Sequence, residues 1–229
     1  MVDCGFKPPE AERRLARLGV KPESLTAILV THEHSDHIGG VGRFAKRHGI
    51  AVWMTAGTFD GWQKHRLSRA QRFNPHESFT VGEIEVRPYP VPHDAREPSQ
   101  FVFSDGARKL GVLSDAGSIT PHMRASLTAC DALLLECNHD PQMLADGPYP
   151  PSLQERVGGD YGHLSNRQAG ELLKSIDCSR LQHLALIHLS QKNNTEALAH
   201  AAVAEALNCG VDDMLVAHQD DGLSWRELR

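Results

Sequence analysis

The sequence predicts a single α/β domain over residues 1–229. Short apolar runs rich in β-branched residues alternate with amphipathic segments along the whole chain, which is the pattern of strands alternating with helices. The chain shows no internal repeat, linker or break in composition, and 229 residues are enough for one sizeable core. One domain is therefore the simplest organisation.

The predicted elements of the N-terminal half follow from apolar periodicity and from glycine. Two amphipathic helices end at Gly19 and Gly49, because glycine adopts the left-handed conformation that closes a helix. A third, polar helix carries Arg66, Arg69 and Arg72 at three-residue intervals, and we expect this face to be solvated rather than bound to nucleic acid. In chain order the segments are a helix over 9–18, a strand over 27–31, a helix over 40–48, a strand over 51–54, a helix over 59–72 and a strand over 84–91.

The C-terminal half continues the alternation. Asp105-Gly106 is a strong hairpin turn, and Ser165 with Gln168 forms a capping box that starts a helix. We interpret the Pro/Gly-rich stretch over 140–159 as a long loop. The other segments are strands over 100–104 and 109–114, a helix over 118–129, a strand over 132–136, a helix over 165–176, a strand over 181–187, a helix over 194–207 and a strand over 213–217.

Composition and charge exclude several classes of protein. Hydrophobic residues make up 40% and charged residues 23%, which argues against disorder and fibrous repeats. No run of 18 apolar residues occurs, so we expect no membrane partner. The net charge of −5 argues against binding nucleic acid by bulk charge alone. Five cysteines without a C-x-x-C pair fit a reducing cytoplasm, and the sequence leaves a homodimer open.

The most informative segment is the histidine-rich run over 31–37, which follows a predicted strand. His32 and His34 are two residues apart, so an extended backbone directs both to the same side. Asp36 and His37 then turn toward a second position. Histidine is the commonest metal ligand, and this H-x-H-x-D-H pattern indicates a metal site rather than a solvated polar loop.

Three further candidate ligands each follow a predicted strand. They are His93, Asp115 and His188. In open α/β folds, ligand sites lie at the carboxyl ends of the strands. We therefore expect these residues to lie at one edge of a sheet.

These motifs resemble those of the metallo-β-lactamase superfamily over nearly the whole chain. Asp3 in Val-Asp-Cys-Gly matches the first motif, a structural aspartate, and the histidine-rich run matches the second. The resemblance implies a four-layer αββα sandwich that holds two divalent metal ions. It further implies that one ion is held by His32, His34 and His93, the other by Asp36, His37 and His188, with Asp115 bridging both.

Such a centre has a definite chemistry. Two dications with two carboxylate ligands attract anions and lower the pKa of a bridging water to about 7. The mixed nitrogen and oxygen ligand set suits Zn²⁺, and also Mn²⁺ or Fe²⁺. Metal-bound hydroxide would be the nucleophile, and Asp36 or Asp115 would orient it.

His163 is a candidate second catalytic residue. It lies in Gly162-His163-Leu164-Ser165-Asn166, just before a predicted helix, where free backbone N–H groups and the helix dipole favour an anion. A histidine there would donate a proton to a leaving oxygen or bind a phosphate, and the alternative is an ordinary surface histidine. The segment is similar to the glycine–histidine motif of tRNase Z and of the phosphonate-pathway phosphodiesterases.

The segments that begin at His93, Gly162 and His188 resemble the YycJ/WalJ group of this superfamily, which includes 5′–3′ exonuclease-like proteins. Two further strands usually precede the Val-Asp-Cys-Gly motif in that group, so we expect one sheet to lack its N-terminal edge strands.

We therefore predict a dinuclear metal-dependent hydrolase, a phosphodiesterase or exonuclease that acts on nucleic acid or a small phosphodiester. A hydrolase of lactams, lactones or thioesters that uses the same site is the first alternative. A degenerate, non-catalytic binding module is the second. Asp115 and His163 favour the phosphodiesterase, and the complete ligand set argues against the binding module.

Overall fold

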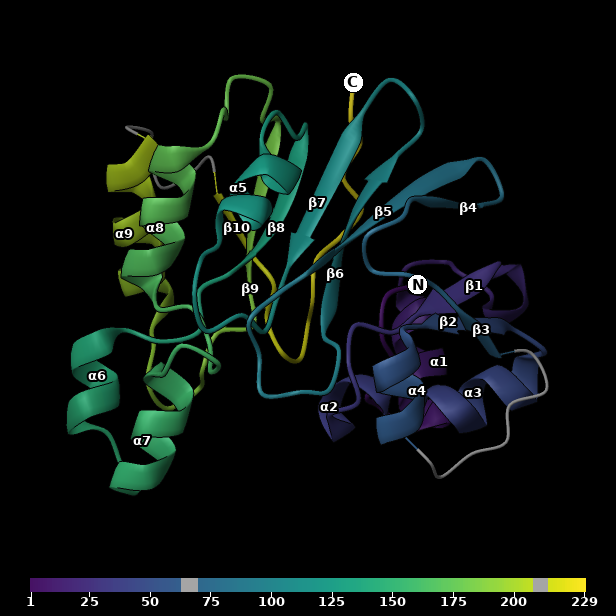
Figure 1. The fold of residues 1–229 in the computed structure, drawn as a ribbon, viewed down its shortest axis with the longest axis horizontal. Helices are drawn as coiled ribbons and strands as arrows, with labels where there is room; N and C mark the ends of the chain where they lie inside the picture. The colour runs from purple at the N-terminus through teal and green to yellow at the C-terminus, as the bar shows by residue number, and fades with distance from the viewer. Residues whose placement is uncertain (63–69, 208–213) are drawn as a thin grey trace. The chain divides into compact units, whose positions relative to one another are not determined.

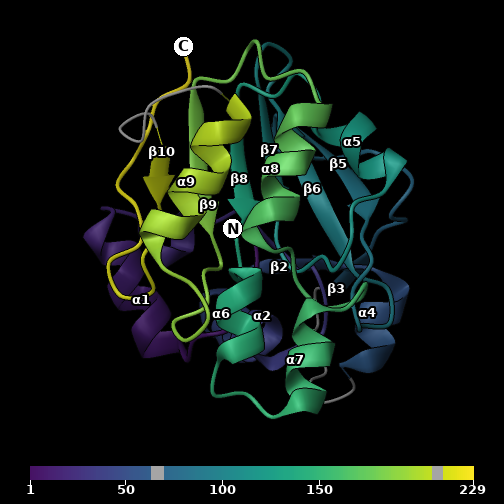
Figure 2. The same cartoon turned by 90° about the vertical axis from the view of Figure 1, so that its left-hand side faces the viewer.

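A computed structural model describes residues 1–62, 70–207 and 214–229. The chain forms two compact units, one made of Met1–Pro90 and Ala95–Ser99, the other of Val91–Asp94 and Gln100–Arg229. Each unit combines strands with helices (Figures 1 and 2), which confirms the α/β class. The organisation as a single domain stays a prediction. None of the described helices is long and apolar enough to cross a bilayer.

The first unit is built on a parallel sheet in the order β1-β2-β3, and Figure 1 shows α1, α3 and α4 on one side of it. Its core includes Ile28, Phe44, Val52 and Met54, whose side chains are fully buried. The strands are β1 (Ala27–Leu29), β2 (Ala51–Met54) and β3 (Ala70–Arg72), and β4 (Phe79–Val81) pairs antiparallel with β5 (Ile84–Pro90). The helices are α1 (Pro8–Arg17), the 3₁₀ turn Pro22–Ser24, α2 (Ser35–Ile38), α3 (Val41–His48) and α4 (Ala56–Gly61).

The predicted helix over 59–72 is wrong at both ends. The helix α4 begins three residues earlier, because the Thr55 hydroxyl accepts the Thr58 N–H (3.2 Å) and caps it, and it ends at Gly61. Residues 70–72 form β3 and pair in parallel with β2. This pairing overrides the polar pattern of the segment. Arg66 and Arg69 lie outside the described residues.

The second unit contains a sheet in the order β6-β7-β8-β9-β10. The β6–β7 pair is the predicted antiparallel hairpin, and the remaining neighbours are parallel. Figures 1 and 2 show α8 and α9 side by side against one face of this sheet. The strands are β6 (Ser99–Ser104), β7 (Lys109–Leu113), β8 (Ala132–Glu136), β9 (His183–Ile187) and β10 (Met214–Val216), and the flanking helices are α5 (Pro121–Leu127), α8 (Asn166–Ser175) and α9 (Glu196–Leu207).

The predicted loop over 140–159 is also wrong, because this segment forms the helices α6 (Pro141–Asp146) and α7 (Pro151–Gly158). Pro141 and Pro151 occupy the first helical positions, where the missing N–H costs nothing and the fixed φ favours a helix. The Asp140 carboxylate accepts the Met143 N–H (2.9 Å) and caps α6. The Gln154 amide donates to the Ala145 carbonyl (3.1 Å) and joins the two helices. Pro141 and Pro151, which contribute to the prediction of a loop, are therefore the first residues of two helices.

Candidate metal centre

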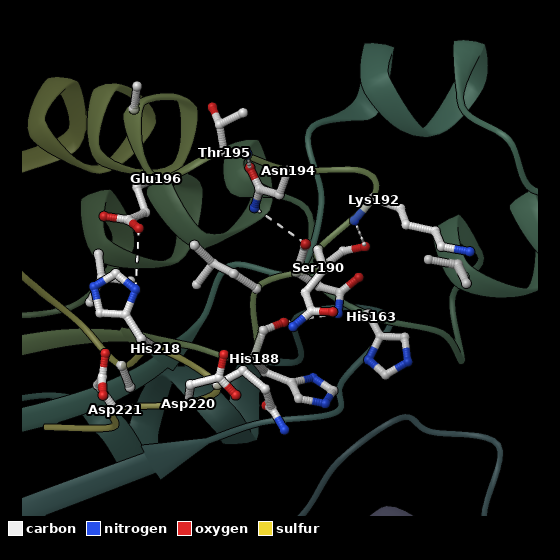
Figure 3. A pocket seen from close by; sticks show the side chains of 18 of the residues that line it. His163, His188, Ser190, Lys192, Asn194, Thr195, Glu196, His218, Asp220 and Asp221 are labelled. Atoms are coloured by element: carbon white, nitrogen blue, oxygen red, sulfur yellow. Dashed lines mark hydrogen bonds and ion pairs between the residues drawn. The ribbon is translucent and has the colours of Figure 1, made fainter.

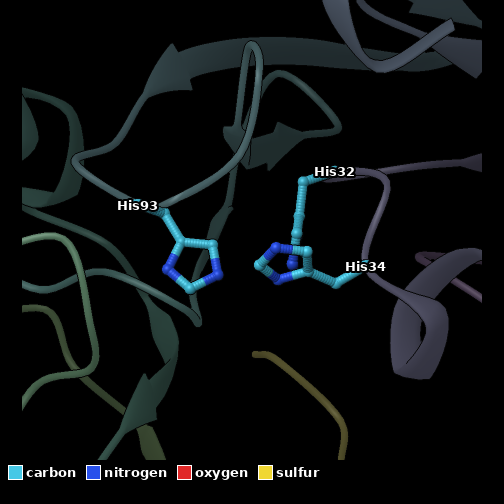
Figure 4. A group of neighbouring side chains, drawn as sticks. All are labelled: His32, His34 and His93. Carbon is cyan, nitrogen blue, oxygen red and sulfur yellow. The ribbon is translucent and has the colours of Figure 1, made fainter. Parts of the chain in front are cut away.

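Four predicted ligands lie together in the first unit, on the turn that follows β1. His32 is buried, and His34 occupies the N-cap position of α2, which carries Asp36 and His37. The ring centroid of His32 lies 4.6 Å from that of His34 and 4.2 Å from that of His37. Figure 4 shows His32 and His34 on this turn. An Asp36 oxygen lies 3.6 Å from His37 Nε2, so the H-x-H-x-D-H spacing gathers three imidazoles and a carboxylate on one short turn.

Asp3 fixes the orientation of two of these rings. Its Oδ1 accepts the Thr31 backbone N–H (2.8 Å), and its Oδ2 accepts both the Thr31 hydroxyl hydrogen (2.8 Å) and His37 Nδ1–H (2.8 Å). Because the Thr31 hydroxyl hydrogen points to Asp3, His32 Nδ1–H donates to Thr31 Oγ1 (2.9 Å). Both imidazoles are thus held in the tautomer whose Nε2 carries the lone pair.

In the second unit, Asp115, His163 and His188 gather around Glu136. Asp115 follows β7, Glu136 ends β8 and His188 follows β9, and the carboxyl ends of these neighbouring parallel strands meet at one edge of the sheet. Glu136 is fully buried, and its Oε1 accepts Nδ1–H of His163 (2.8 Å) and of His188 (2.9 Å). This carboxylate therefore fixes both imidazoles.

The remaining oxygen of Glu136 is also satisfied by the protein. Its Oε2 accepts the backbone N–H groups of Ala116 (3.1 Å) and Leu164 (3.2 Å). Burial alone would raise the pKa of Glu136, but the hydrogen bonds from His163 and His188 hold that pKa below its ordinary value. Glu136 is therefore a buried anion whose carboxylate accepts four hydrogen bonds.

Asp115 is a second buried carboxylate beside Glu136. Its Oδ1 lies 3.5 Å from His163 Nδ1 and 3.7 Å from His188 Nδ1, and the Ser114 hydroxyl donates to its Oδ2. One ligand atom from each of the two carboxylates and two histidines lies within 4.8 Å of the others. Burying two carboxylates this close together is costly unless positive charge compensates them, and a bound cation would supply it.

His93 follows β5 and belongs to the second unit. It is buried, its Nδ1–H donates to the Gly162 carbonyl (3.0 Å), and its ring centroid lies 5.3 Å from that of His163. Burial lowers the pKa of His93 and so keeps the ring neutral, as a metal ligand must be. The Asp94 N–H donates to the Tyr161 carbonyl (3.0 Å) and holds the adjacent backbone in place.

Three of the site residues share an unfavourable backbone conformation. Asp3, Asp115 and His188 have φ values of 52°, 54° and 58°, in the left-handed region that residues other than glycine rarely adopt. Such conformations cost about 1–3 kcal/mol each and persist where the surrounding structure holds them. Asp115 and His188 are candidate metal ligands that follow strand ends, so the backbone strain lies at the predicted site.

The histidines of each unit are suited to binding a divalent metal ion. His32, His37, His93 and His188 each direct Nδ1–H to a protein acceptor, which is how metal-binding histidines are oriented. Imidazole nitrogens with carboxylate oxygens form a donor set that suits Zn²⁺ and also Mn²⁺ or Fe²⁺. The assignment of individual ligands to two ions stays a prediction.

Comparison with known proteins identifies the family. Residues 1–189 match the model of the β-lactamase superfamily domain. The chain belongs to the metallo-β-lactamase superfamily. It is 31% identical to the exodeoxyribonuclease YycJ of Bacillus anthracis, over 96% of this chain and 86% of that protein. It is 33% identical to the exodeoxyribonuclease WalJ of Streptococcus pneumoniae, over 90% of this chain and 79% of that protein.

A solved structure shows the same fold. The metallo-β-lactamase fold protein YhfI from Bacillus subtilis superposes with a TM-score of 0.75 at 20% sequence identity, over 98% of this chain and 85% of that chain. The chain therefore has the α/β metallo-β-lactamase fold, with a parallel sheet, a mixed sheet and flanking helices. Its clustered histidines and carboxylates are those of a metal-dependent hydrolase of this superfamily.

Glu136 is the site residue that the sequence analysis did not select. It ends the apolar strand Ala132–Glu136 just as Asp115 and His188 follow apolar strands. The same rule, a polar residue at the carboxyl end of a buried strand, therefore points to it.

The backbone before α8 also differs from the expectation of free N–H groups. The N–H groups of Leu164, Ser165 and Asn166 donate to Glu136, Gln168 and the His139 carbonyl. An anion near His163 would therefore meet the histidine side chain rather than these N–H groups.

Proposed function

We propose that the chain is a two-metal phosphodiesterase that removes nucleotides from the ends of nucleic-acid strands. The observation that carries the proposal is the pair of His163 and the buried anion Glu136, beside Asp115 and His188. An imidazole held by a buried carboxylate is suited to proton transfer. The likeness to two exodeoxyribonucleases supports nucleic acid as the substrate class.

Under this proposal the metal ligands are His32, His34 and His93 for one ion, Asp36, His37 and His188 for the other, and Asp115 for both. Bound divalent ions would polarise a phosphoryl group and supply hydroxide near neutral pH. Asp36 or Asp115 would orient the attacking group. Zn²⁺ is the ion that we expect, with Mn²⁺ or Fe²⁺ as alternatives.

His163 would act at the leaving oxygen. Its Nδ1–H is held by Glu136 at 2.8 Å, and about a fifth of its side chain is exposed, so the ring is fixed yet accessible. When Nε2 carries a proton, the Glu136 carboxylate stabilises the imidazolium. Nε2 would then give this proton to the departing oxygen, a transfer typically worth about 10²–10⁴-fold in rate.

The proposal is tested by a substrate comparison after loading with Zn²⁺ or Mn²⁺. End-labelled single-stranded DNA and bis-p-nitrophenyl phosphate report phosphodiester cleavage, and nitrocefin reports lactam cleavage. We expect the labelled strand to shorten from an end and nitrocefin to stay intact. Turnover of nitrocefin without cleavage of either diester would instead support the lactam, lactone or thioester hydrolase. No turnover of any substrate by metal-loaded protein would support the non-catalytic module.

A further inference from the structure

A cleft of about 950 Å³ opens beside His163 and His188 (Figure 3). Its walls come from the second unit alone. They include the segment between β9 and α9, the first residues of α9, the end of β10 with the residues after it, and Tyr149 between α6 and α7. A volume of this size is typical of a pocket for one small ligand rather than a groove for a duplex. The cleft is therefore large enough for the end of a single strand.

Charge is distributed unevenly around the cleft. Among the described residues that line it, Lys192 is the one side chain with a fixed positive charge. Figure 3 shows Lys192 and His163 toward one end of the cleft, and Glu196 and Asp221 toward the other. Glu196 also forms an ion pair with His218 (3.2 Å). A polyanion is attracted to the Lys192 end and repelled by the acidic end.

We propose that Lys192 binds a phosphate of the substrate strand. The cleft would then hold one terminal nucleotide beside the phosphodiester whose leaving oxygen His163 protonates. This inference rests on the proposed function and adds a subsite to it. A lysine binds phosphate as a point charge, without demanding a fixed geometry. The acidic end of the cleft disfavours a strand that continues past it, which suits removal from an end.

Tyr149 positions this ammonium group. Lys192 Nζ lies 5.7 Å from the centre of the Tyr149 ring, within the range of a cation–π contact. The contact restricts a long side chain that otherwise has many rotamers. It also gives the α6–α7 segment a part in substrate binding, because Tyr149 lies in the connection between these helices.

The test compares Lys192→Ala and Lys192→Arg with Lys174→Ala in the metal-loaded protein. Lys174 is an exposed lysine of α8 that pairs with Glu205 (3.1 Å) and does not line the cleft, so it is a matched control. The readouts are the KM for single-stranded DNA and the Kd for a hydrolysis-resistant phosphorothioate strand across a range of salt concentrations. Bis-p-nitrophenyl phosphate, which has no second phosphate, is the comparison substrate.

We expect Lys192→Ala to raise the KM and Kd for the strand about tenfold, as for one lost charge-assisted contact. The slope of log Kd against log salt should become shallower by about 0.7, the value for one phosphate contact to a single strand. Lys192→Arg should restore most of the binding. The small diester should lose much less kcat/KM than the strand, and Lys174→Ala should match the wild type.

Equal Kd values and salt slopes for Lys192→Ala and Lys174→Ala would overturn the subsite. Equal losses on the strand and on the small diester would also overturn it, because Lys192 would then act at the reacting phosphate. Failure of the wild-type protein to bind or cleave the strand would contradict the proposed function itself. The two failures are therefore distinguishable.

Discussion

Glu136→Gln tests the arrangement of the site most sharply, because the substitution keeps the shape of the side chain and removes its charge. The carboxylate accepts four hydrogen bonds, from His163 (2.8 Å), His188 (2.9 Å), Ala116 (3.1 Å) and Leu164 (3.2 Å). An amide has one oxygen and one NH₂ group. In either orientation, two of the four buried donors face the NH₂ group and lose their acceptor.

The magnitude follows from this count. Each buried donor left unsatisfied costs about 1–3 kcal/mol, so we expect the free energy of unfolding to fall by about 3 kcal/mol. Loss of a residue that orients metal ligands typically lowers activity or metal affinity by about 10–100-fold. We expect kcat/KM for single-stranded DNA to fall toward the upper end of this range, because His163 also loses its anion.

The assay combines urea unfolding, metal content and kcat/KM at fixed metal concentration. Asp131→Asn is the matched control, because Asp131 is a buried carboxylate that accepts the Lys109 N–H (2.7 Å) and the Arg180 guanidinium (2.9 Å) and is not a predicted site residue. The control should lose stability and keep its kcat/KM per folded molecule. A Glu136→Gln variant that retains both wild-type stability and turnover of DNA would refute the reasoning.

Three further predictions concern other parts of the chain. His163→Ala should retain its metals and lose about 10²–10⁴-fold in turnover of DNA, with a smaller loss on bis-p-nitrophenyl phosphate because p-nitrophenolate needs little protonation. Kinetics on both substrates together with metal analysis check this prediction. Equal losses on both substrates would contradict proton donation by His163. Ala129 lies outside the predicted site and has a φ of 56°, a conformation that is strained for alanine but not for glycine. Ala129→Gly should therefore raise the free energy of unfolding by about 1 kcal/mol, measured by urea unfolding. A less stable variant would show that this conformation is not strained. Burial alone would raise the pKa of Asp131, but the hydrogen bonds from Lys109 and Arg180 outweigh it and hold that pKa below its ordinary value. The stability from Asp131 is therefore complete above about pH 4 and is lost as the pH falls through the lowered pKa, so the stability gap to Asp131→Asn should shrink in acid; a constant gap would contradict this.

The sequence predicts those elements best in which local pattern and tertiary environment agree. The apolar runs over 51–54 and 132–136 coincide with β2 and β8, because a short apolar run is typical of a strand inside a parallel sheet and each of these strands has a parallel neighbour on both sides. Gly19 and Gly49 follow α1 and α3 with φ values of 70° and 69°, as helix-closing glycines do. In these cases no distant contact alters what the local pattern indicates.

An element whose local pattern is overridden by a distant partner is predicted incorrectly. Strand β3 has a polar sequence and exists because it pairs with β2, a contact that no local pattern encodes. The predicted site also contains features that follow from local spacing and features that depend on distant segments. The spacing of His32, His34 and His37 is local and was informative, whereas the part played by Glu136 depends on rings that come from two other segments. Its hydrogen bonds become visible only in the folded chain.

Titration of metal into chelator-treated protein, followed by the initial rate on end-labelled single-stranded DNA, tests the central claim most directly. A two-metal phosphodiesterase should be inactive without metal and should reach its maximal rate at about two equivalents of Zn²⁺ or Mn²⁺ per chain. The small diester should follow the same titration curve. A rate on DNA that does not depend on added metal, or that is complete at one equivalent, would contradict the account.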